Sequence, residues 1–470
     1  MKAQLRQDEI KKDLTEIRGP IPLAEAMARS FMHNLDHRVK MMEEAISLQQ
    51  LDLGKFDLLP RLTAQAGYVG RSKFSASSST DMTGKRVEDF SYSQERDRLT
   101  GELTTTWNIL DFGLSYTNAL QQADRNLVAR ERRRKVIHNL MQEVRSAYWR
   151  TASSQKLRDQ VTQTIAQAEK ALLDSKKAEA ENIKNPIEVL RFQRTLLETI
   201  RQLESIDQEL SSANTELSVL MGVPPGSGFT VVVPENANLR VPDWEMTVIR
   251  MEELALSQNP DLREQAYQER ISTLDTRKAI LKLLPGISFN LSQQYDSNAM
   301  SKYNQWVDAG ARISFNLFSI FSAPAELATA ETGERLTTLR AQAMQMATLA
   351  QTHIALRQFA IARHQYERAS QLFELDERIL RHSQVREAHD AQSTLERISN
   401  QTTMIVGLLR RYLALAQVHA ALGRIHATIG QDPLPESVAD NSLPALTRLF
   451  EKALSDGQPA GSSEKPVNPS

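Results

Sequence analysis

The sequence predicts a mainly α-helical protein with a small β part, in which one helix-hairpin-helix unit occurs twice. Three observations support this fold class. Landmark residues recur in the same order in the two halves of the chain, long stretches contain neither glycine nor proline, and short stretches alternate between apolar and polar residues. A chain of 470 residues would ordinarily suggest two to four domains. The recurrence instead favours a single unit present in two copies.

The duplication is visible at four landmarks: an asparagine-led pentapeptide, a Leu-Leu-Pro, an aromatic-Asn-aliphatic segment and a helix-closing glycine. The first two landmarks are 225 residues apart in the two copies, and the offset falls to about 205 later, so the first copy contains a longer insert. Chance similarity of amphipathic regions explains a shared order poorly. The landmarks are 34–38 and 259–263, 58–60 and 283–285, 106–109 and 314–317, and Gly222 and Gly423.

The landmarks divide the chain into two repeats with flanking segments. The C-terminal end is rich in Gly, Ser and Pro from about residue 455, a composition typical of disorder. The predicted parts are a polar N-terminal segment 1–20, a first repeat 21–222, a linker 223–243, a second repeat 244–430 and a C-terminal segment 431–470.

Each repeat begins with a helix and ends with two very long helices. Apolar residues recur with helical periodicity, and a helix of about 68 residues would extend about 100 Å. Such helices cannot bury their apolar stripes in a small core, so we expect them to pack as coiled coils. The predicted helices are 23–56, 115–182 and 186–221, then 244–283 with a break at Asn259-Pro260, 325–386 and 389–429.

Strict alternation predicts strands at 59–69, 99–110, 285–295 and 305–318. A half-buried sheet in a soluble domain is one interpretation. A second is a membrane sheet, because the strands have about the length of membrane-crossing strands and aromatic residues lie toward their ends. Four strands cannot close a barrel and an open edge is not tolerated in lipid, so several chains would share one barrel; three would supply twelve strands. The aromatic candidates for the membrane interface are Tyr68, Trp107, Tyr295, Trp306, Phe315 and Phe318.

Composition argues against several other functions. The net charge of −1 makes nucleic acid a poor partner, and the absence of cysteine excludes disulfides and thiolate chemistry. No enzyme motif, cofactor motif or metal site is evident, so we expect no catalysis and no cofactor. His33 and His37 are four residues apart on a predicted helix, but without a third ligand a solvated pair is expected. The basic run 130–135 is expected to be a solvated helix face.

Hydropathy shows no apolar run near the roughly 18 residues of a spanning helix, but it is nearly blind to membrane strands. Residues 1–20 are charged throughout and contain no signal-peptide core. We therefore expect either a cytoplasmic protein or a sequence that begins at a mature or truncated end. The absence of cysteine also excludes a lipid-modified N-terminal cysteine in this chain.

These features together resemble the TolC-like outer-membrane efflux family over about residues 20–430. The resemblance rests on the Leu-Leu-Pro before each first strand, the segment 107–113 (Trp-Asn-Ile-Leu-Asp-Phe-Gly) and the duplication. It implies a homotrimer with a twelve-strand β-barrel in the bacterial outer membrane, continued by a long α-helical barrel in the periplasm. It also implies a periplasmic adaptor and an inner-membrane pump as partners.

In that family the narrow periplasmic end lies where paired helices reverse, which here is 180–190 and 385–396. Some members close the aperture with two acidic residues three apart in the second reversal, and matching by position puts these at Ser393 and Glu396. The matching positions of the first copy are Glu188 and Arg191. With Asp390, these residues are the aperture candidates; ordinary solvated tip residues are the alternative for each of them.

Two functions remain open from the sequence. The first is a passive outer-membrane exit duct for substrates delivered by an inner-membrane pump. The second is a soluble duplicated coiled-coil scaffold whose strands form a small sheet. The cargo of a duct, whether drugs, metal ions or secreted proteins, cannot be inferred from these residues.

Overall fold

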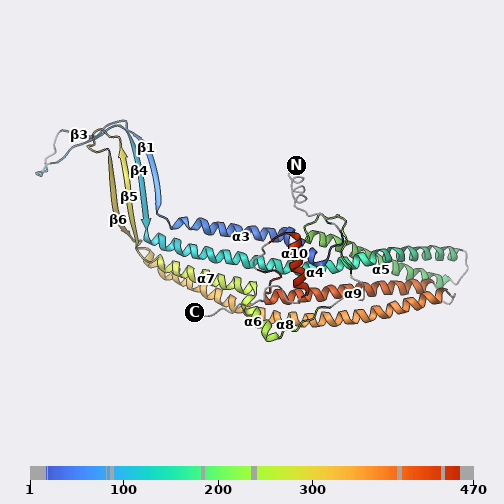
Figure 1. The fold of residues 1–470 in the computed structure, drawn as a ribbon. Helices are drawn as coiled ribbons and strands as arrows, with labels where there is room; N and C mark the ends of the chain where they lie inside the picture. The colour runs from blue at the N-terminus through green and yellow to red at the C-terminus, as the bar shows by residue number, and fades with distance from the viewer. Residues whose placement is uncertain are drawn as a thin grey trace. The chain divides into compact units, whose positions relative to one another are not determined.

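The structure is a computed structural model that describes residues 17, 19–80, 82–84, 89–180, 186–233, 241–388, 394–435 and 440–455. The chain divides into two compact units (Figure 1). The first unit comprises Met1–Glu43, Arg130–Glu264 and Gln342–Ser470, and the second comprises Glu44–Ala129 and Gln265–Ala341. Each unit contains parts of both predicted repeats, so the repeats are not separate compact domains.

The second unit contains a four-stranded antiparallel sheet with the order β1-β4-β5-β6 (Figure 1). Its strands are β1 (Arg61–Gly70), β4 (Asp97–Asn108), β5 (Gly286–Asp296) and β6 (Gln305–Ser314). Two short strands, β2 (Ser75–Ser77) and β3 (Ser91–Gln94), pair within the longer insert of the first copy. Neither β1 nor β6 has a second partner strand among the described residues.

The register places most apolar residues of the four strands on one face of the sheet. Directly paired residues of antiparallel strands share a face, and successive residues alternate between faces. The apolar face contains Leu62, Ala64, Ala66, Tyr68, Leu99, Leu103, Trp107, Ile287, Phe289, Leu291, Tyr295, Val307, Ala309, Ala311 and Ile313. Large members such as Leu62 and Ile313 are 64% and 73% exposed, so none of the residues that the structure describes covers this face.

The helices of the second unit lie side by side in the same order as the strands. They are parts of α3 (Leu35–Gly54), α4 (Ile109–Ala180), α7 (Pro260–Leu281) and α8 (Ser319–Ala388), with a short 3₁₀ turn at Phe56–Leu58. Side chains link each neighbouring pair: Gln122 donates to Gln50 and to the Ser47 carbonyl, Gln121 to Asp275, and Thr276 to Glu334. Helices and strands therefore form one continuous layer with two open sides.

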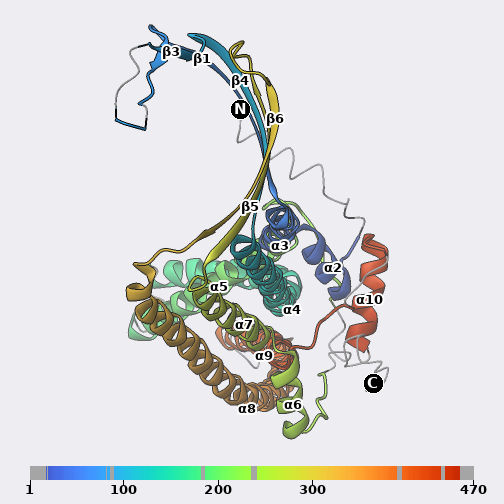
Figure 2. The same ribbon diagram turned by 90° about the vertical axis from the view of Figure 1, so that its left-hand side faces the viewer.

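The first unit has a hydrophobic core to which helices distant in sequence contribute. Its elements are the remaining parts of the helices above, together with α2 (Leu23–His33), α5 (Pro186–Leu220), α6 (Val248–Gln258), α9 (Thr394–Ile429) and α10 (Leu443–Ser455). Helix α10 packs beside α2, which lies at the other end of the sequence (Figure 2). Fully buried members of the core include Met27, Tyr148, Leu217, Met251, Tyr412 and Phe450.

Among the described helices, one stretch is long and apolar enough to cross a membrane by length and composition. This stretch, Glu396–Ile429, is not a continuous apolar run, and 67% of its most apolar window is buried inside the chain. Because its apolar side chains already pack against the other helices of the first unit, it is the core helix of that unit.

Each repeat contains a joint between an asparagine and a glycine. Asn34 and Asn259 cap the N-termini of α3 and α7, where their side-chain oxygens accept bonds from the N–H of His37 and of Asp261. Their amides donate to the last carbonyls of α5 and α9, at Leu220 (3.4 Å) and Thr428 (2.8 Å). The asparagine therefore fixes the start of one helix against the end of another.

The glycines that follow α5 and α9 complete the joints. Gly222 and Gly430 both have φ of +71°, and a Cβ on either would contact the backbone of the residue just before the capping asparagine. The predicted pairing of Gly222 with Gly423 is therefore wrong. Gly423 lies inside α9, where it allows close approach to Gln142 of α4.

Several predicted boundaries differ from the structure. The first helix breaks at Asn34, which caps a new helix without the proline that signals the break at Asn259. Strand β6 ends at Ser314 rather than at 318, because Asn316 begins the turn into α8. Helices α4 and α8 begin at Ile109 and Ser319, earlier than 115 and 325, since Asn108 caps α4 and Pro324 is accommodated in the first turns of α8.

The joints predict a large cost for a side chain at Gly430. We expect Gly430→Ala to lower the stability of the protein by about 3 kcal/mol, because a left-handed backbone and a clash with the Gln258 backbone act together. Gly226→Ala is the matched control, since Gly226 has φ of +89° but open space around it. Thermal unfolding measures both; equal losses of stability would show that the contact at the joint is unimportant.

Candidate functional site

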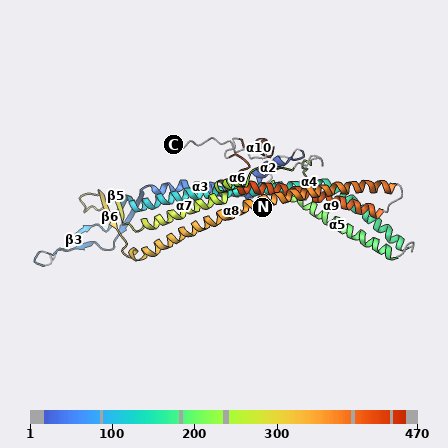
Figure 3. The same ribbon diagram turned by 90° about the horizontal axis from the view of Figure 1, so that it is seen from below.

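The helix reversals of the first unit place three of the aperture candidates at exposed positions. Glu188 and Arg191 lie in the first two turns of α5 and Glu396 in the first turn of α9, and all three are exposed. Asp390 and Ser393 lie outside the described residues. In Figure 3, α4 and α5 run side by side toward one reversal, and α8 and α9 toward the other.

Glu188 and Glu396 occupy equivalent positions in the two repeats. Each lies 32 residues before the carbonyl that the asparagine of its joint binds, which is Leu220 for Glu188 and Thr428 for Glu396. The predicted equivalence of Glu188 with Ser393, and of Arg191 with Glu396, is therefore wrong by three residues. A carboxylate in the first turn stabilises a helix through the helix dipole, so capping alone accounts for part of this similarity.

A small apolar cluster holds the described parts of the tips together. Leu172 of α4, Leu196 and Ile200 of α5 and Ile398 of α9 are buried against one another. Hydrogen bonds flank this cluster: Arg397 donates to Gln167 at 2.8 Å, and Gln401 to Thr164 at 2.9 Å. Helix α9 is thus fixed to α4 just behind Glu396, while Glu396 itself is exposed.

A second candidate site is the apolar face of the sheet in the second unit, where aromatic residues form two rows. Tyr68 and Tyr295 lie at the loop end, and Trp107 and Phe289, whose rings are 6.5 Å apart, lie at the helix end. Leu99 pairs with Tyr68 and precedes Trp107 by eight residues, so the rows are about 26 Å apart along the strand. With the strand tilt of about 35–45° in membrane barrels, the rows would lie about 20 Å apart along the barrel axis. An apolar band between two aromatic girdles is typical of such barrels.

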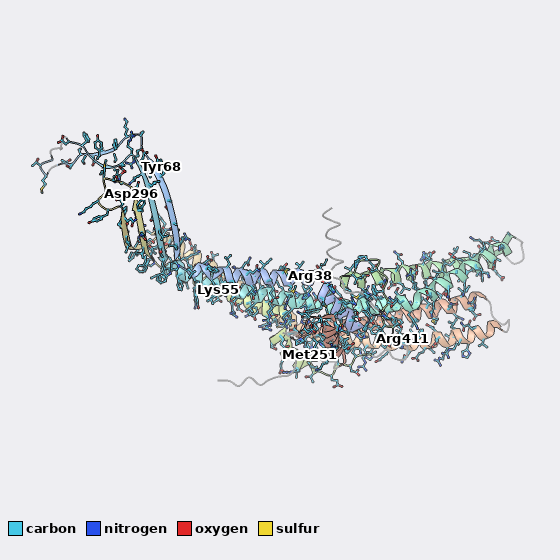
Figure 4. The ribbon with its side chains drawn as sticks, turned by 45° about the horizontal axis from the view of Figure 1, so that its top comes forward. Arg38, Lys55, Tyr68, Met251, Asp296 and Arg411 are labelled. Carbon is cyan, nitrogen blue, oxygen red and sulfur yellow. The ribbon has the colours of Figure 1, made fainter. Side chains whose placement is uncertain are left out.

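Polar contacts mark the loop end of the strands. The Tyr68 hydroxyl donates to Asp97 at 2.7 Å, and Arg98 forms an ion pair with Asp296 at 2.7 Å (Figure 4). Tyr68 therefore combines an apolar ring on the apolar face with a hydroxyl bound at the polar end, as expected for an interfacial tyrosine.

The other three aromatic candidates are placed differently. Trp306 pairs with Gln294, and Gln294 pairs with Glu102, so the indole belongs to the polar face, where it donates to Asp308 at 3.0 Å. Phe315 and Phe318 follow the end of β6 and are exposed in the turn before α8. The prediction that Trp306 lies in the aromatic girdle is therefore wrong. Successive strand residues alternate between faces, so Trp306 lies on the face opposite to that of its neighbour Val307.

The histidine pair and the basic run are less solvated than predicted. His37 is only 3% exposed, and its Nδ1 lies 2.8 Å from the Phe31 carbonyl. Burial lowers the pKa of His37. Within the basic run, Arg134 binds Glu131 at 2.5 Å and Asp432 at 3.0 Å, so part of that helix face is an internal ion-pair network. Among the described residues, no group of three or more His, Cys, Asp or Glu side chains could hold a metal ion.

Known proteins share both the sequence features and the fold. Residues 35–223 match the sequence model of the outer membrane efflux protein family. The chain resembles CusC with 14% identity and a TM-score of 0.65, over 89% of this chain and 95% of that one. No curated protein sequence matches this chain.

Two outer membrane channels give similar results. For CmeC of Campylobacter jejuni the identity is 11% and the TM-score 0.68, over 87% of this chain and 85% of that one. For the open state of MtrE from Neisseria gonorrhoeae the identity is 15% and the TM-score 0.63, over 85% of this chain and 88% of that one. Similarity at such low identity establishes the fold.

The opposite placement of two tryptophans gives a direct test of the sheet faces. Proteins that keep only Trp107 or only Trp306, with the other tryptophans replaced by phenylalanine, are reconstituted in bilayers with brominated acyl chains. We expect strong quenching of Trp107 emission and little of Trp306, because only the first lies on the apolar face. Equal quenching of both would contradict this assignment.

Proposed function

We propose that this chain is the passive exit duct of a tripartite export system, from the match of residues 35–223 to the outer membrane efflux protein family and from the fold that the chain shares with TolC-like channels. In this proposal three copies of the chain form a twelve-strand barrel in the outer membrane and a helical tunnel in the periplasm. An inner-membrane pump supplies the energy and a periplasmic adaptor connects it to the duct. The chain itself performs no chemistry.

The observation that supports this proposal most strongly is the open four-stranded sheet. Among the described residues, β1 and β6 have no outer partner, and the apolar face is uncovered. Unpaired strand edges are not tolerated in lipid, so the edges require further strands. If β6 of one copy pairs with β1 of the next, the backbone N–H and C=O groups of every edge strand are hydrogen-bonded once the ring closes. Three copies close a ring of twelve strands, with the apolar face toward lipid and the polar face toward the lumen.

The helices of the second unit support the same closure. They follow the strands in one layer, linked pairwise by side-chain hydrogen bonds, and their order equals the strand order. A ring of three copies would therefore continue the barrel as a wall of helices without a change of neighbours. The exposed apolar residues of α8, among them Leu336 and Leu339, are available for contacts with a neighbouring copy.

We place the aperture of the duct at the helix reversals of the first unit. Threefold symmetry would turn Glu188, Arg191 and Glu396 into rings around the lumen, with Asp390 and Ser393 as further candidates. Glu188 and Glu396 together would contribute six carboxylates, whose mutual repulsion a bound cation or the Arg191 ring would reduce. The chemical class of the exported cargo stays open, because the lumen wall belongs to three chains.

Membrane association distinguishes the duct from a duplicated coiled-coil scaffold. We expect the full-length protein, expressed with a functional leader, to remain in the outer-membrane fraction after salt and carbonate washing. The uncovered apolar face of the sheet is the reason, since lipid must cover it. A known peripheral membrane protein in the same preparation is the control for the wash. Release of the chain into the supernatant would support the scaffold.

The aperture is tested by charge removal at the two equivalent glutamates. In planar bilayers, we expect Glu188→Gln and Glu396→Gln each to raise the Mg²⁺ concentration that blocks half of the current, by about fivefold. The estimate assumes the loss of about 1 kcal/mol of attraction per ring. Glu204→Gln, an exposed glutamate farther along α5, is the control and should leave the block unchanged. Wild-type block in both tip variants would remove these residues from the aperture.

A further inference from the structure

Arg145 of α4 is a buried arginine without a counter-ion. Arg145 is 8% exposed, and its Nε is buried and unpartnered. Within the described part of the chain, its side chain forms no hydrogen bond or ion pair. Other buried or half-buried arginines of this unit have partners: Arg29 pairs with Glu25 at 2.7 Å, Arg134 pairs with Asp432, and Arg411 donates to Ser370 at 3.2 Å. A buried charge without a partner is very costly, so buried charges in proteins are normally compensated.

The charge of Arg145 persists at neutral pH. Burial lowers its pKa to about 10, and no carboxylate counteracts this shift. The carboxylate of Asp432, which lies in the same unit, is already bound by Arg134 and by His138 at 3.0 Å. Among the described residues, no carboxylate therefore compensates the charge of this guanidinium.

A small cavity lined by both polar and apolar residues lies beside Arg145. Its volume is about 30 Å³, which is room for one or two species of the size of water. Arg145, Gln142 and His138 of α4, His426 of α9 and Gln431 supply its polar lining, and Met27 and Phe450 belong to its apolar lining. The cavity is thus small and bordered by one cationic side chain and two side-chain amides, and none of the residues that line it is acidic.

The histidines near Arg145 add no negative charge. Burial, followed by the charge of Arg145, lowers the pKa of His426 and of His419 to about 3, so both rings are neutral at pH 7. Gln431 accepts from His426 Nδ1 at 3.1 Å, which fixes the orientation of that ring at the cavity. The single N–H of the neutral His426 ring is therefore used on Gln431, which leaves Arg145 and the side-chain amides of Gln142 and Gln431 as donors at the cavity. Neutral rings and amides cannot balance a cation.

We propose that this cavity binds a single halide ion, chloride in the cell, as the counter-ion of Arg145. The cavity volume suits a monatomic anion. The residues that line it come from α2, α4, α9, α10 and the segment after α9. Bound chloride would therefore stabilise the packing of helices from both ends of the sequence. This site does not depend on the proposed duct function.

Halide dependence of unfolding tests the proposal with the full-length protein in detergent. Sodium chloride is titrated against sodium gluconate at constant ionic strength, and the melting temperature is recorded. We expect it to rise with chloride and to saturate, because a ligand that binds only the folded state stabilises it until the site is full. Arg145→Met should abolish the response. Arg150→Met is the matched control, because Arg150 is on the same helix but is paired with Glu216 at 2.6 Å; it should keep the response.

Crystals soaked in bromide give a second measurement that needs no variant. We expect an anomalous peak in the cavity next to the guanidinium of Arg145. If Arg145→Met does not fold, the wild-type titration and the bromide peak decide. A melting temperature that is equal in chloride and gluconate, a chloride response that persists in Arg145→Met, or a cavity without a bromide peak would overturn the proposal.

Discussion

The asparagine–glycine joint is the contact from which each repeat is organised. A single asparagine side chain caps one helix with its oxygen and binds the last turn of another helix with its amide, at Asn34 and again at Asn259. The glycine after that second helix must be left-handed and without a Cβ, because the chain passes against the backbone just before the asparagine. Two distant parts of the sequence therefore meet only where an asparagine and a glycine occur together.

A second constraint acts on the sheet and its neighbouring helices. The first repeat contributes one pair of strands and helices to a single layer, and the second repeat contributes the neighbouring pair. This layer has two open sides. A soluble sheet could protect its edges with a bulge, a charge or a covering helix. Here β6 is exposed along its whole length, and the apolar face of the sheet is uncovered. Assembly with further copies in a membrane would pair the open strand edges and cover the apolar face, which a lone chain does not do.

Much of this organisation was predictable from the sequence, because the signals have local physical causes. Alternation identified the strands, and the asparagines at 108 and 316 belong to the recognised motif because each begins the turn into a long helix. The errors also have causes. The break at Asn34 lacks a proline, and Gly423 was paired with Gly222 although only Gly430 shares its left-handed backbone. The same error in the residue-number difference between the repeats paired Glu188 with Ser393, whereas Glu188 corresponds to Glu396.

The buried charge could not be predicted from the sequence, because burial of Arg145 depends on contacts between distant segments. On its own, α4 shows Arg145 as one of many arginines of a long, charged helix. Only the packing of α2 and α10, from opposite ends of the chain, together with the close approach of α9 at Gly423, encloses the site. An arginine retained in such a place is costly unless an anion accompanies it. The same contacts that bury Arg145 therefore leave a cavity beside it, which the proposed chloride would fill.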